Sequence, residues 1–550
     1  MQRGTRQPGT SQRGTNQPGT RHRSFWGWGH DDQALDAGER ANLAERLAPL
    51  VGTGLTSAAP PDIADIELPL IRVTIPDVLA HSFDTDPAIR AGHCYGKSFR
   101  DVVRGLAGDF AAAPDAVAFP TTEGEVASLL DWAESEGVIM APYGGGSSVT
   151  GGVEVPIDER DGRPFVSLDL SRLSGVLEID HASRAARILA GTYGPELEDA
   201  LRPEGLTLRH YPQSFEFSSL GGWLATRSGG HFATLHTHID DFVESIRAVT
   251  PAGVWESRRL PGSGAGPSPD RLLLGSEGIF GVITEAWMRL QDRPEHRSSF
   301  VAKFPSFSSA CDAARTLAQS GLWPQNCRVL DEVEALISGA GDGTAALLLV
   351  GFESAHISVD AEATEARELV GDAGGAVQPS TRSAETWRSS FLRAPYIRDA
   401  LVQFGLVNET FETAMTWDHL DDFVRSVRDA TNAALISAGC GPTPLVSCRL
   451  THVYPDGAAP YFTITAPGRP GTERLAQWAE VKAAAMDTIA NLGGTVTHHH
   501  AVGRDHRPGY DRQVPPPFQS VLRAAKSALD PSWILNPGVL VDRPAGDAFP

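Results

Sequence analysis

The feature that most constrains this chain is a glycine-rich stretch at residues 142–155, which reads PYGGGSSVTGGVEV. Glycine has no side chain to block a ligand and adopts positive φ angles at little cost, so backbone N–H groups here can point at a phosphate. The preceding residues predict a strand at 117–119, a capping box of Thr122 and Glu125, and then a helix. The stretch fits neither GxGxxG opening a helix nor GxxxxGK[ST]. Either it binds a dinucleotide on another fold, or it is a tight turn between strands.

Two further stretches of small residues follow this one. Residues 212–230 read PQSFEFSSLGGWLATRSGG, and residues 275–284 read GSEGIFGVIT. The second of these comes after a clear strand at 246–250, and both are flanked by β-rich sequence. A single turn does not need so many glycine and hydroxyl residues. The three stretches together predict one extended ligand laid across several loops.

Length and composition indicate an ordinary globular protein. The 550 residues exceed what one hydrophobic core usually serves, which predicts at least two domains. The net charge of −21 argues against a nucleic-acid partner. The cysteines are scattered without CxxC spacing, so we expect neither a disulfide framework nor a structural zinc site, and a reducing cytoplasm is the natural compartment. No run of about 18 apolar residues could span a bilayer, and the first residues lack a signal-peptide core.

The first residues differ from the rest of the chain. Residues 1–24 repeat Gly, Thr, Gln, Arg and Pro with almost no apolar content, which predicts a disordered basic tail. Residues 25–29 read FWGWG, and two tryptophans beside such a tail predict a segment that docks onto the folded body. A helix is expected over residues 35–51.

In their order and spacing, the three small-residue stretches resemble the PCMH-type FAD-binding domain of the vanillyl-alcohol-oxidase superfamily. Later motifs resemble the alkyldihydroxyacetonephosphate synthase family, whose members make the ether bond of ether lipids. These motifs are WGWG at 26–29, YIRD at 396–399, FETAMTW at 411–417, CRLTHVY at 448–454, HHH at 498–500 and DPSWILNPG at 530–538. The resemblance covers nearly everything from Phe25 onward.

This resemblance implies an α+β fold, in which a two-subdomain FAD-binding domain is joined to a cap domain with an antiparallel sheet and flanking helices. The expected divisions are a tail at 1–24, a docking and helical segment at 25–84, the FAD-binding domain at 85–292, the cap or substrate domain at 293–489, and a C-terminal segment at 490–550 that returns to the flavin.

The resemblance also implies which residues contact FAD. These are Pro142, Tyr143, Gly144, Gly145, Gly146, Ser147, Ser148, Gly151, Pro212, Ser214, Ser218, Ser219, Gly221, Gly222, Thr226, Arg227, Ser228, Glu277, Gly278, Gly281, Val282 and Ile283. Many superfamily members attach the flavin covalently to a histidine that follows the three glycines. Serines stand there in this chain, so we expect non-covalent FAD.

Residues beyond the three stretches would decide the reaction. By resemblance, Tyr461 and the histidines His498, His499 and His500 are catalytic, while Arg398 and Arg328 bind substrate. From the residues alone, Tyr461 in an alternating strand is typical of core packing, and Arg398 of a surface or capping arginine. The histidine run is typical of a half-buried strand end, where neighbouring imidazoles point to opposite faces. Such a split argues against a metal site, and none is expected.

The implied reaction exchanges the acyl group of acyl-dihydroxyacetone phosphate for a fatty alcohol through an adduct at the flavin N5, without net redox change. Tyr461 and His499 would assist proton transfers, and Arg398 with the histidines would hold the phosphate. Two other hypotheses remain open. The first is an FAD-linked oxidase or dehydrogenase of a 2-hydroxy acid or alcohol, and the second is a non-catalytic FAD- or lipid-binding protein.

Three further expectations concern the compartment, membrane contact and oligomeric state of the protein. We expect a cytoplasmic protein with peripheral membrane contact, for which residues 339–343 are one candidate surface, and a homodimer.

Overall fold

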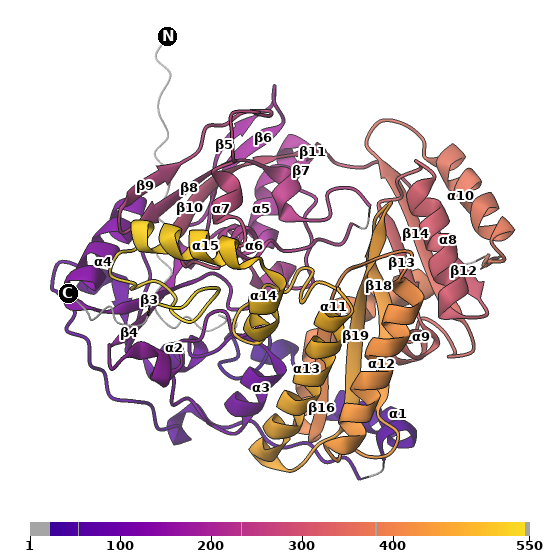
Figure 1. Cartoon of the computed structure of the whole chain (residues 1–550), viewed down its shortest axis with the longest axis horizontal. Helices are drawn as coiled ribbons and strands as arrows, with labels where there is room; N and C mark the ends of the chain where they lie inside the picture. Colours follow the sequence, from indigo (N-terminus) through magenta and orange to yellow (C-terminus); the bar gives the residue numbers. More distant parts are fainter. Residues whose placement is uncertain (1–21, 53, 233, 380–381, 545–550) are drawn as a thin grey trace.

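The computed structural model describes residues 22–52, 54–232, 234–379 and 382–544, with the backbone only for 382–390. Figure 1 shows two lobes side by side. One is built on the strands from β1 (Phe83–Asp84) to β11 (Gln291–Asp292), and the other on the strands from β12 (His296–Phe304) to β19 (Gly457–Pro467). Residues 1–21 of the expected tail lie outside the described residues. None of the described helices is long and apolar enough to cross a membrane.

The first lobe begins with a sheet whose longer strands are parallel. In sheet order these strands are β1 (Phe83–Asp84), β2 (Ala116–Ala118), β4 (Phe165–Asp169) and β3 (Ile139–Tyr143). Helix α4 (Glu123–Glu136) follows Thr122, which accepts the amide N–H of Glu125. The Glu125 carboxylate accepts from Thr121 and not from Thr122, so only half of the predicted capping box forms. Strand β3 ends where the glycine-rich stretch begins, at the carboxyl edge of a buried parallel sheet, which is where ligands bind in many α/β proteins.

The second sheet of this lobe is antiparallel and has five strands. In order they are β5 (Val176–Asp180), β6 (Ala185–Leu189), β10 (Val282–Arg289), β8 (Val243–Thr250) and β9 (Gly253–Glu256). Helices α5 (Gly194–Leu201) and α6 (Leu220–Thr226) pack on it, and both sheets share one apolar core. Of the two later stretches of small residues, one contains α6 and the other leads into β10, the central strand of this sheet.

The cap lobe contains an eight-stranded sheet. Its order is β15 (Ala376–Val377), β12 (His296–Phe304), β14 (Ala346–Ser354), β13 (Asn326–Leu330), β18 (Leu445–Val453), β19 (Gly457–Pro467) and β16 (Leu406–Glu412), with β17 (Met415–Thr416) paired to β19. One face is covered by helices α8 (Phe307–Gln319), α10 (Asp360–Asp372), α12 (Leu420–Ser437) and α13 (Arg474–Asn491), as Figure 1 shows.

Strand alternation decides which cap residues face away from those helices. Along β19, Phe462 and Ile464 are buried in the core beneath the helices, so Tyr461 and Thr463 point to the other face. The same period places Arg328 of β13 and Arg449 of β18 on the face that bears Tyr461. The cap sheet thus presents its polar residues toward the first lobe.

Segments from both ends of the chain join the lobes. Residues 22–31 form a small turn closed by a bridge between Arg23 and His30, and helix α1 (Ala37–Val51) then lies against β19. At the other end, helices α14 (Arg507–Gln513) and α15 (Pro516–Leu529) return across the first lobe (Figure 1). The buried Lys526 of α15 donates to the carbonyls of Ile279 and Leu535, both at 2.7 Å.

Candidate active site

A single large cavity of about 900 Å³ lies between the cap sheet and the first lobe. This volume is near the upper end of the range of roughly 300–1,000 Å³ that ligand pockets occupy. The three small-residue stretches line one part of the cavity, and the polar face of the cap sheet lines another. Leucines of α1 line a third part. The cavity therefore brings together residues that are hundreds of positions apart in the chain.

The glycine-rich stretch is shaped so that only glycine fits at its centre. A Cβ at Gly145 would lie 1.8 Å from the carbonyl oxygen of Phe217, and Gly146 has a φ of +65° with the Tyr143 hydroxyl 1.8 Å from where a Cβ would be. Both glycines are buried, and within the described chain their amides have no acceptor among protein groups. Buried amides without acceptors indicate that a ligand supplies the oxygens, as the pyrophosphate of FAD would.

Most of the residues expected to contact FAD line this cavity. Among them are Pro142, Tyr143, Gly144, Gly145, Gly146, Ser147, Ser148, Pro212, Ser214, Ser218, Ser219, Gly221, Gly222, Thr226, Ser228, Glu277, Gly278, Gly281 and Ile283.

Three of the expected residues do not line it, and each has a physical reason. Val282 alternates with its neighbours along β10 and is fully buried in the core. Arg227 ends α6 in a left-handed conformation and pairs with Asp240 at 2.9 Å. Gly151 turns away, toward the guanidinium of Arg100.

The C-terminal segment closes this part of the cavity through Glu277. Its carboxylate accepts the amides of Val502 and Gly503 at 2.9 and 2.8 Å, and Asn536 donates to its carbonyl at 2.8 Å. Burial raises the pKa of Glu277 to about 7, against the lowering effect of those two amides. Glu277 thus connects the third small-residue stretch to the segment that carries the histidines.

Tyr461 lies on the cavity wall beneath an arginine that was not predicted from the sequence. The guanidinium of Arg449 is 3.9 Å from the centre of the Tyr461 ring and pairs with Glu334 at 2.6 Å. Burial raises the pKa of Tyr461, with Arg449 opposing it, so the hydroxyl keeps its proton at neutral pH. The alternation of CRLTHVY, which puts Arg449 and Thr451 on one face, is the signal that could have identified Arg449.

Arg328 reaches the same cavity from β13. Its Nη2 donates to the carbonyl oxygen of His231 at 2.9 Å and contacts His231 Nδ1 at 3.2 Å. Burial lowers the pKa of Arg328 to about 9, helped by the nearby Arg449, and the side chain is still a cation at neutral pH. Two guanidinium groups beside one cavity favour an anionic ligand.

Arg398 lines the cavity from helix α11 (Arg382–Gln403) and is held by its neighbour. Its Nε donates to Asp399 at 2.9 Å, and its Nη1 donates to the carbonyl of Lys97. Asp399 in turn accepts the backbone amide of Trp28 at 2.5 Å. The tryptophan segment that was expected to dock therefore docks on the residue that orients Arg398. Gly29 is required there, because a Cβ would lie 2.1 Å from the Tyr396 hydroxyl.

The histidine run does not end a strand, so the expectation that its imidazoles point to opposite faces is wrong. Residues 498–500 form a series of bends. The fully buried carboxylate of Glu412 at the end of β16 shapes these bends by accepting the backbone amides of His498, His499 and His500. It also accepts the Thr497 hydroxyl at 2.7 Å. One carboxylate therefore fixes the whole run.

Glu412 is ionised because its donors outweigh its burial. Burial alone would raise the pKa of Glu412, but His500, His498, the Thr497 hydroxyl and the His499 amide lower it to about 2. Burial also lowers the pKa values of the three histidines, so at neutral pH their imidazoles are neutral. At neutral pH the ionised carboxylate therefore stands among neutral imidazoles and accepts their backbone amides.

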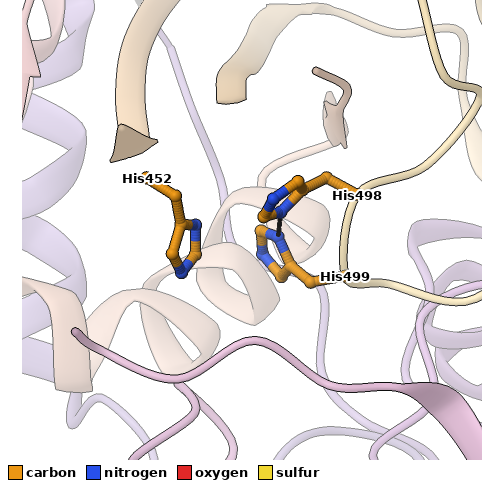
Figure 2. A group of neighbouring side chains, drawn as sticks. All are labelled: His452, His498 and His499. Carbon is orange, nitrogen blue, oxygen red and sulfur yellow. Dashed lines mark hydrogen bonds between the residues drawn. The ribbon is translucent and has the colours of Figure 1, made fainter. Parts of the chain in front are cut away.

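The bends bring the imidazoles next to Tyr461 and to one another. The ring of His500 lies 5.5 Å from that of Tyr461, and the ring of His499 lies 6.2 Å away. His498 Nδ1 is 2.9 Å from His499 Nδ1, the contact that is dashed in Figure 2, and the ring of His452 from β18 stands beside both. Neutral imidazoles next to a protonated phenol can transfer protons near neutral pH.

Comparisons with known proteins agree with this architecture. Residues 114–257 match the family described as FAD binding domain, and residues 293–540 match FAD linked oxidases, C-terminal domain. Alkyldihydroxyacetonephosphate synthase of Dictyostelium discoideum is 33% identical over 83% of this chain and 78% of its own length. The enzyme of the same name from Trypanosoma brucei brucei is 30% identical over 84% and 79%. Glycolate oxidase subunit GlcD of Bacillus subtilis is 24% identical over 88% and 97%.

Solved structures give the same result. A crystal structure of alkyldihydroxyacetonephosphate synthase superposes with a TM-score of 0.79 at 27% identity, covering 94% of this chain and 98% of its own. p-Cresol methylhydroxylase, at 14% identity and a TM-score of 0.65, shares the fold. The predicted α+β fold and FAD as the cofactor are confirmed. The chain belongs to the alkyldihydroxyacetonephosphate synthase family.

Proposed function

We propose that this protein is an FAD-dependent alkyldihydroxyacetonephosphate synthase, which exchanges the acyl group of acyl-dihydroxyacetone phosphate for a fatty alcohol. The observation that supports this most is the composition of the cavity. Arg398, Tyr461, His499 and His500 line it beside the glycine loops, and a group of apolar side chains, the apolar arm, lines it as well. A substrate with a phosphate at one end and a long hydrocarbon chain matches both kinds of lining.

The apolar arm is built from helices that meet the cap sheet. Its apolar lining residues are Leu43, Leu47, Leu50, Leu336, Ile337 and Leu401. Removing hydrocarbon from water is favourable by about 0.8 kcal/mol per buried CH₂ group. An arm of this kind binds the acyl or alkyl chain and would serve a small 2-hydroxy acid poorly.

The protein's own groups then have separate tasks. Arg398 and Arg328 bind the phosphate oxygens, and the fork of a guanidinium suits two oxygens at once. Tyr461 holds a proton for the leaving carboxylate oxygen, and His499 and His500 take up and return protons. Bound FAD, in its reduced form, supplies the nucleophile for the exchange. Holding both partners in a cavity that excludes water favours exchange over hydrolysis.

The test is direct formation of the ether. The FAD-loaded protein is incubated with palmitoyl-dihydroxyacetone phosphate and labelled hexadecanol, and the expected product is the labelled ether with release of palmitate. An intact, FAD-loaded protein that makes no ether would refute the proposal. Rapid anaerobic reduction of its FAD by a 2-hydroxy acid would support an oxidase or dehydrogenase instead.

We expect FAD to be released without breaking a covalent bond. Serines 147 and 148 follow the glycines where a flavin-linked histidine would stand. Acid precipitation should therefore leave the yellow colour in the supernatant, and the denatured polypeptide should have the mass of the chain alone. A mass increase equal to that of FAD would contradict this.

Arg398→Lys should weaken binding of the phosphorylated substrate. Lysine keeps the charge but loses the fork, and a hydrogen bond to a charged group contributes about 1.5–3 kcal/mol, so KM for acyl-dihydroxyacetone phosphate should rise by roughly 10- to 100-fold. KM for the alcohol should change little. The matched control is Arg393→Lys on the same helix, a half-buried arginine that pairs with Glu39 at 3.1 Å and does not line the cavity, which should leave both values unchanged.

We also propose peripheral membrane contact near Leu336, and a homodimeric state. Leu336 lines the apolar arm and is 41% exposed, and the candidate segment 339–343 begins three residues later. Leu336→Glu should reduce co-flotation with phosphatidylcholine vesicles while FAD content stays the same. Equal flotation of the variant and the parent protein would place the contact elsewhere.

Analytical ultracentrifugation of the FAD-loaded protein tests the proposed homodimer, and a monomer mass would exclude it.

A further inference from the structure

Three histidines from two distant parts of the chain converge beside the cavity, which two of them, His452 and His499, line. His452 stands near the end of β18, while His498 and His499 belong to the bends fixed by Glu412. One ring nitrogen from each lies within 4.8 Å of the other two, and Figure 2 shows the His452 ring turning a nitrogen toward its partners. The group consists of imidazoles only, which is a ligand set for zinc, copper or nickel and not for magnesium or calcium.

The outer hydrogen bonds of His452 and His498 match those of metal-binding histidines. His452 Nε2 lies 2.9 Å from the carbonyl oxygen of Gly230, and His498 Nε2 lies 2.6 Å from the Tyr454 hydroxyl. His452 Nδ1 lies 3.1 Å from the Thr451 hydroxyl, which a metal ion would displace. A histidine ligand usually uses its second nitrogen in such a bond, which fixes the ring and leaves the first nitrogen with its lone pair.

We propose that His452, His498 and His499 form a binding site for one divalent transition-metal ion, Zn²⁺ by preference, and that occupation of this site inhibits the enzyme. Zinc–nitrogen bonds of about 2.0–2.1 Å place tetrahedral ligand nitrogens about 3.4 Å apart. The Nδ1 atoms of His498 and His499 are 2.9 Å apart, so they must separate slightly, and His452 must approach. The fourth position faces the cavity and is open to water or to a substrate oxygen.

Inhibition follows from the atoms that the ion would use. A hydrogen bond between the two Nδ1 atoms needs a proton on one of them, and a metal ion would take the place of that proton, which is released. His499, held by a metal, can no longer exchange protons beside Tyr461. This second part rests on the proposed function, whereas binding of the ion does not.

The experiment uses FAD-loaded protein without a histidine tag, dialysed against EDTA and then against metal-free buffer. Calorimetric titration with ZnCl₂ should give one ion per chain. Titration with CoCl₂ should produce the visible d–d bands of a tetrahedral site, to the red of the flavin absorption. A protein that binds no zinc, or one that binds it without these cobalt bands, would overturn the proposed site.

Variants assign the ion to these residues. His452→Asn and His498→Asn should each weaken zinc binding by more than about 100-fold, because loss of an outer hydrogen-bond partner alone costs about 10- to 100-fold. His452→Cys supplies another zinc ligand and should restore binding. The control His419→Asn changes an exposed histidine outside the cavity and should have no effect. FAD content shows whether each variant is folded. Unchanged affinity in both asparagine variants would move the site elsewhere.

Ether synthesis measured in the same titration tests the second part. Activity should fall in proportion to occupancy and return on addition of EDTA. If zinc binds with one ion per chain and ether synthesis is unchanged, the proposed inhibition is wrong, whereas the proposed metal site is supported. If the metal-free protein makes no ether at all, the proposed function has failed, and the calorimetry still decides the metal site.

Discussion

Tyr461→Phe should lower the rate of ether synthesis by about 10²- to 10⁴-fold, the usual contribution of a positioned acid or base. The change removes one hydroxyl and leaves the ring beneath the Arg449 guanidinium, so packing is kept. Burial raises the pKa of Tyr461, and the hydroxyl is therefore a proton donor over the whole neutral range. The loss should appear in kcat, with KM for both substrates nearly constant.

Initial rates per bound FAD, with thermal melting of each protein, check this prediction. The matched control is Tyr510→Phe, which removes a hydroxyl from a partly buried tyrosine outside the cavity and should leave kcat unchanged. A Tyr461→Phe protein that works within a few-fold of the parent would show that Tyr461 only packs. If the parent protein and Tyr461→Phe both bind FAD and both lack every measurable activity, the non-catalytic hypothesis would gain support.

Glu412→Gln should lower kcat by about 100-fold or more and also destabilise the protein. An amide cannot accept from all the donors that the carboxylate satisfies, and each buried donor left without an acceptor costs about 1–3 kcal/mol. The bends would then relax, and a shift of about 1 Å in reacting groups can cost 10²-fold in rate. Glu412 is a positioning residue, because it acts through His499 and His500.

The pH dependence of stability separates Glu412 from an ordinary buried acid. Its pKa in the folded protein, about 2, lies below its ordinary value, so its stabilisation is complete above about pH 4.5 and is lost as the pH falls toward 2. The difference in unfolding free energy between parent and Glu412→Gln should therefore be constant from pH 7 to 5 and shrink below pH 4.5. Urea unfolding at several pH values measures it.

The matched control is Asp530→Asn, which removes a buried carboxylate at another place in the fold. Asp530 is also a fully buried carboxylate that accepts two backbone amides, those of Ile534 and Leu535, but it pairs with Lys526 and lines no part of the cavity. This variant should lose stability and keep the kcat of its folded, FAD-loaded fraction. Equal losses of kcat in both variants would mean that Glu412 has only a general structural role.

Local patterns in the sequence identified most of the glycine and serine residues that line the cavity. The glycines at 144–146 are needed where the backbone turns tightly against Phe217 and Tyr143, and glycine composition reveals such a need directly. The alternation of β19 was also visible, but alternation alone assigns a residue to a face and does not say which face lines a cavity. For that reason Tyr461 could equally have been a core residue.

Other parts depend on contacts that no local pattern contains. The histidine run looked like a strand end because its neighbours are compatible with a strand, and its bends come from Glu412, 86 positions before His498. The link between Trp28 and Asp399 spans 371 positions. Nothing near either residue indicates its partner, and the same holds for Arg449 and Glu334. Such pairs follow from the packing of the two lobes.

The links from Trp28 to Asp399 and from Glu277 to Val502 and Gly503 also matter during synthesis. While the ribosome is still making the chain, the strands of the two larger sheets of the first lobe are complete once residue 289 has emerged, yet the apolar core of this lobe still lacks its residues from 502 to 541. The carboxylate of Glu277 likewise has no amides to accept until residues 502 and 503 follow. The tryptophan segment, made first, waits for Asp399. An incomplete chain therefore has no complete site, and flavin retention can report whether synthesis has finished.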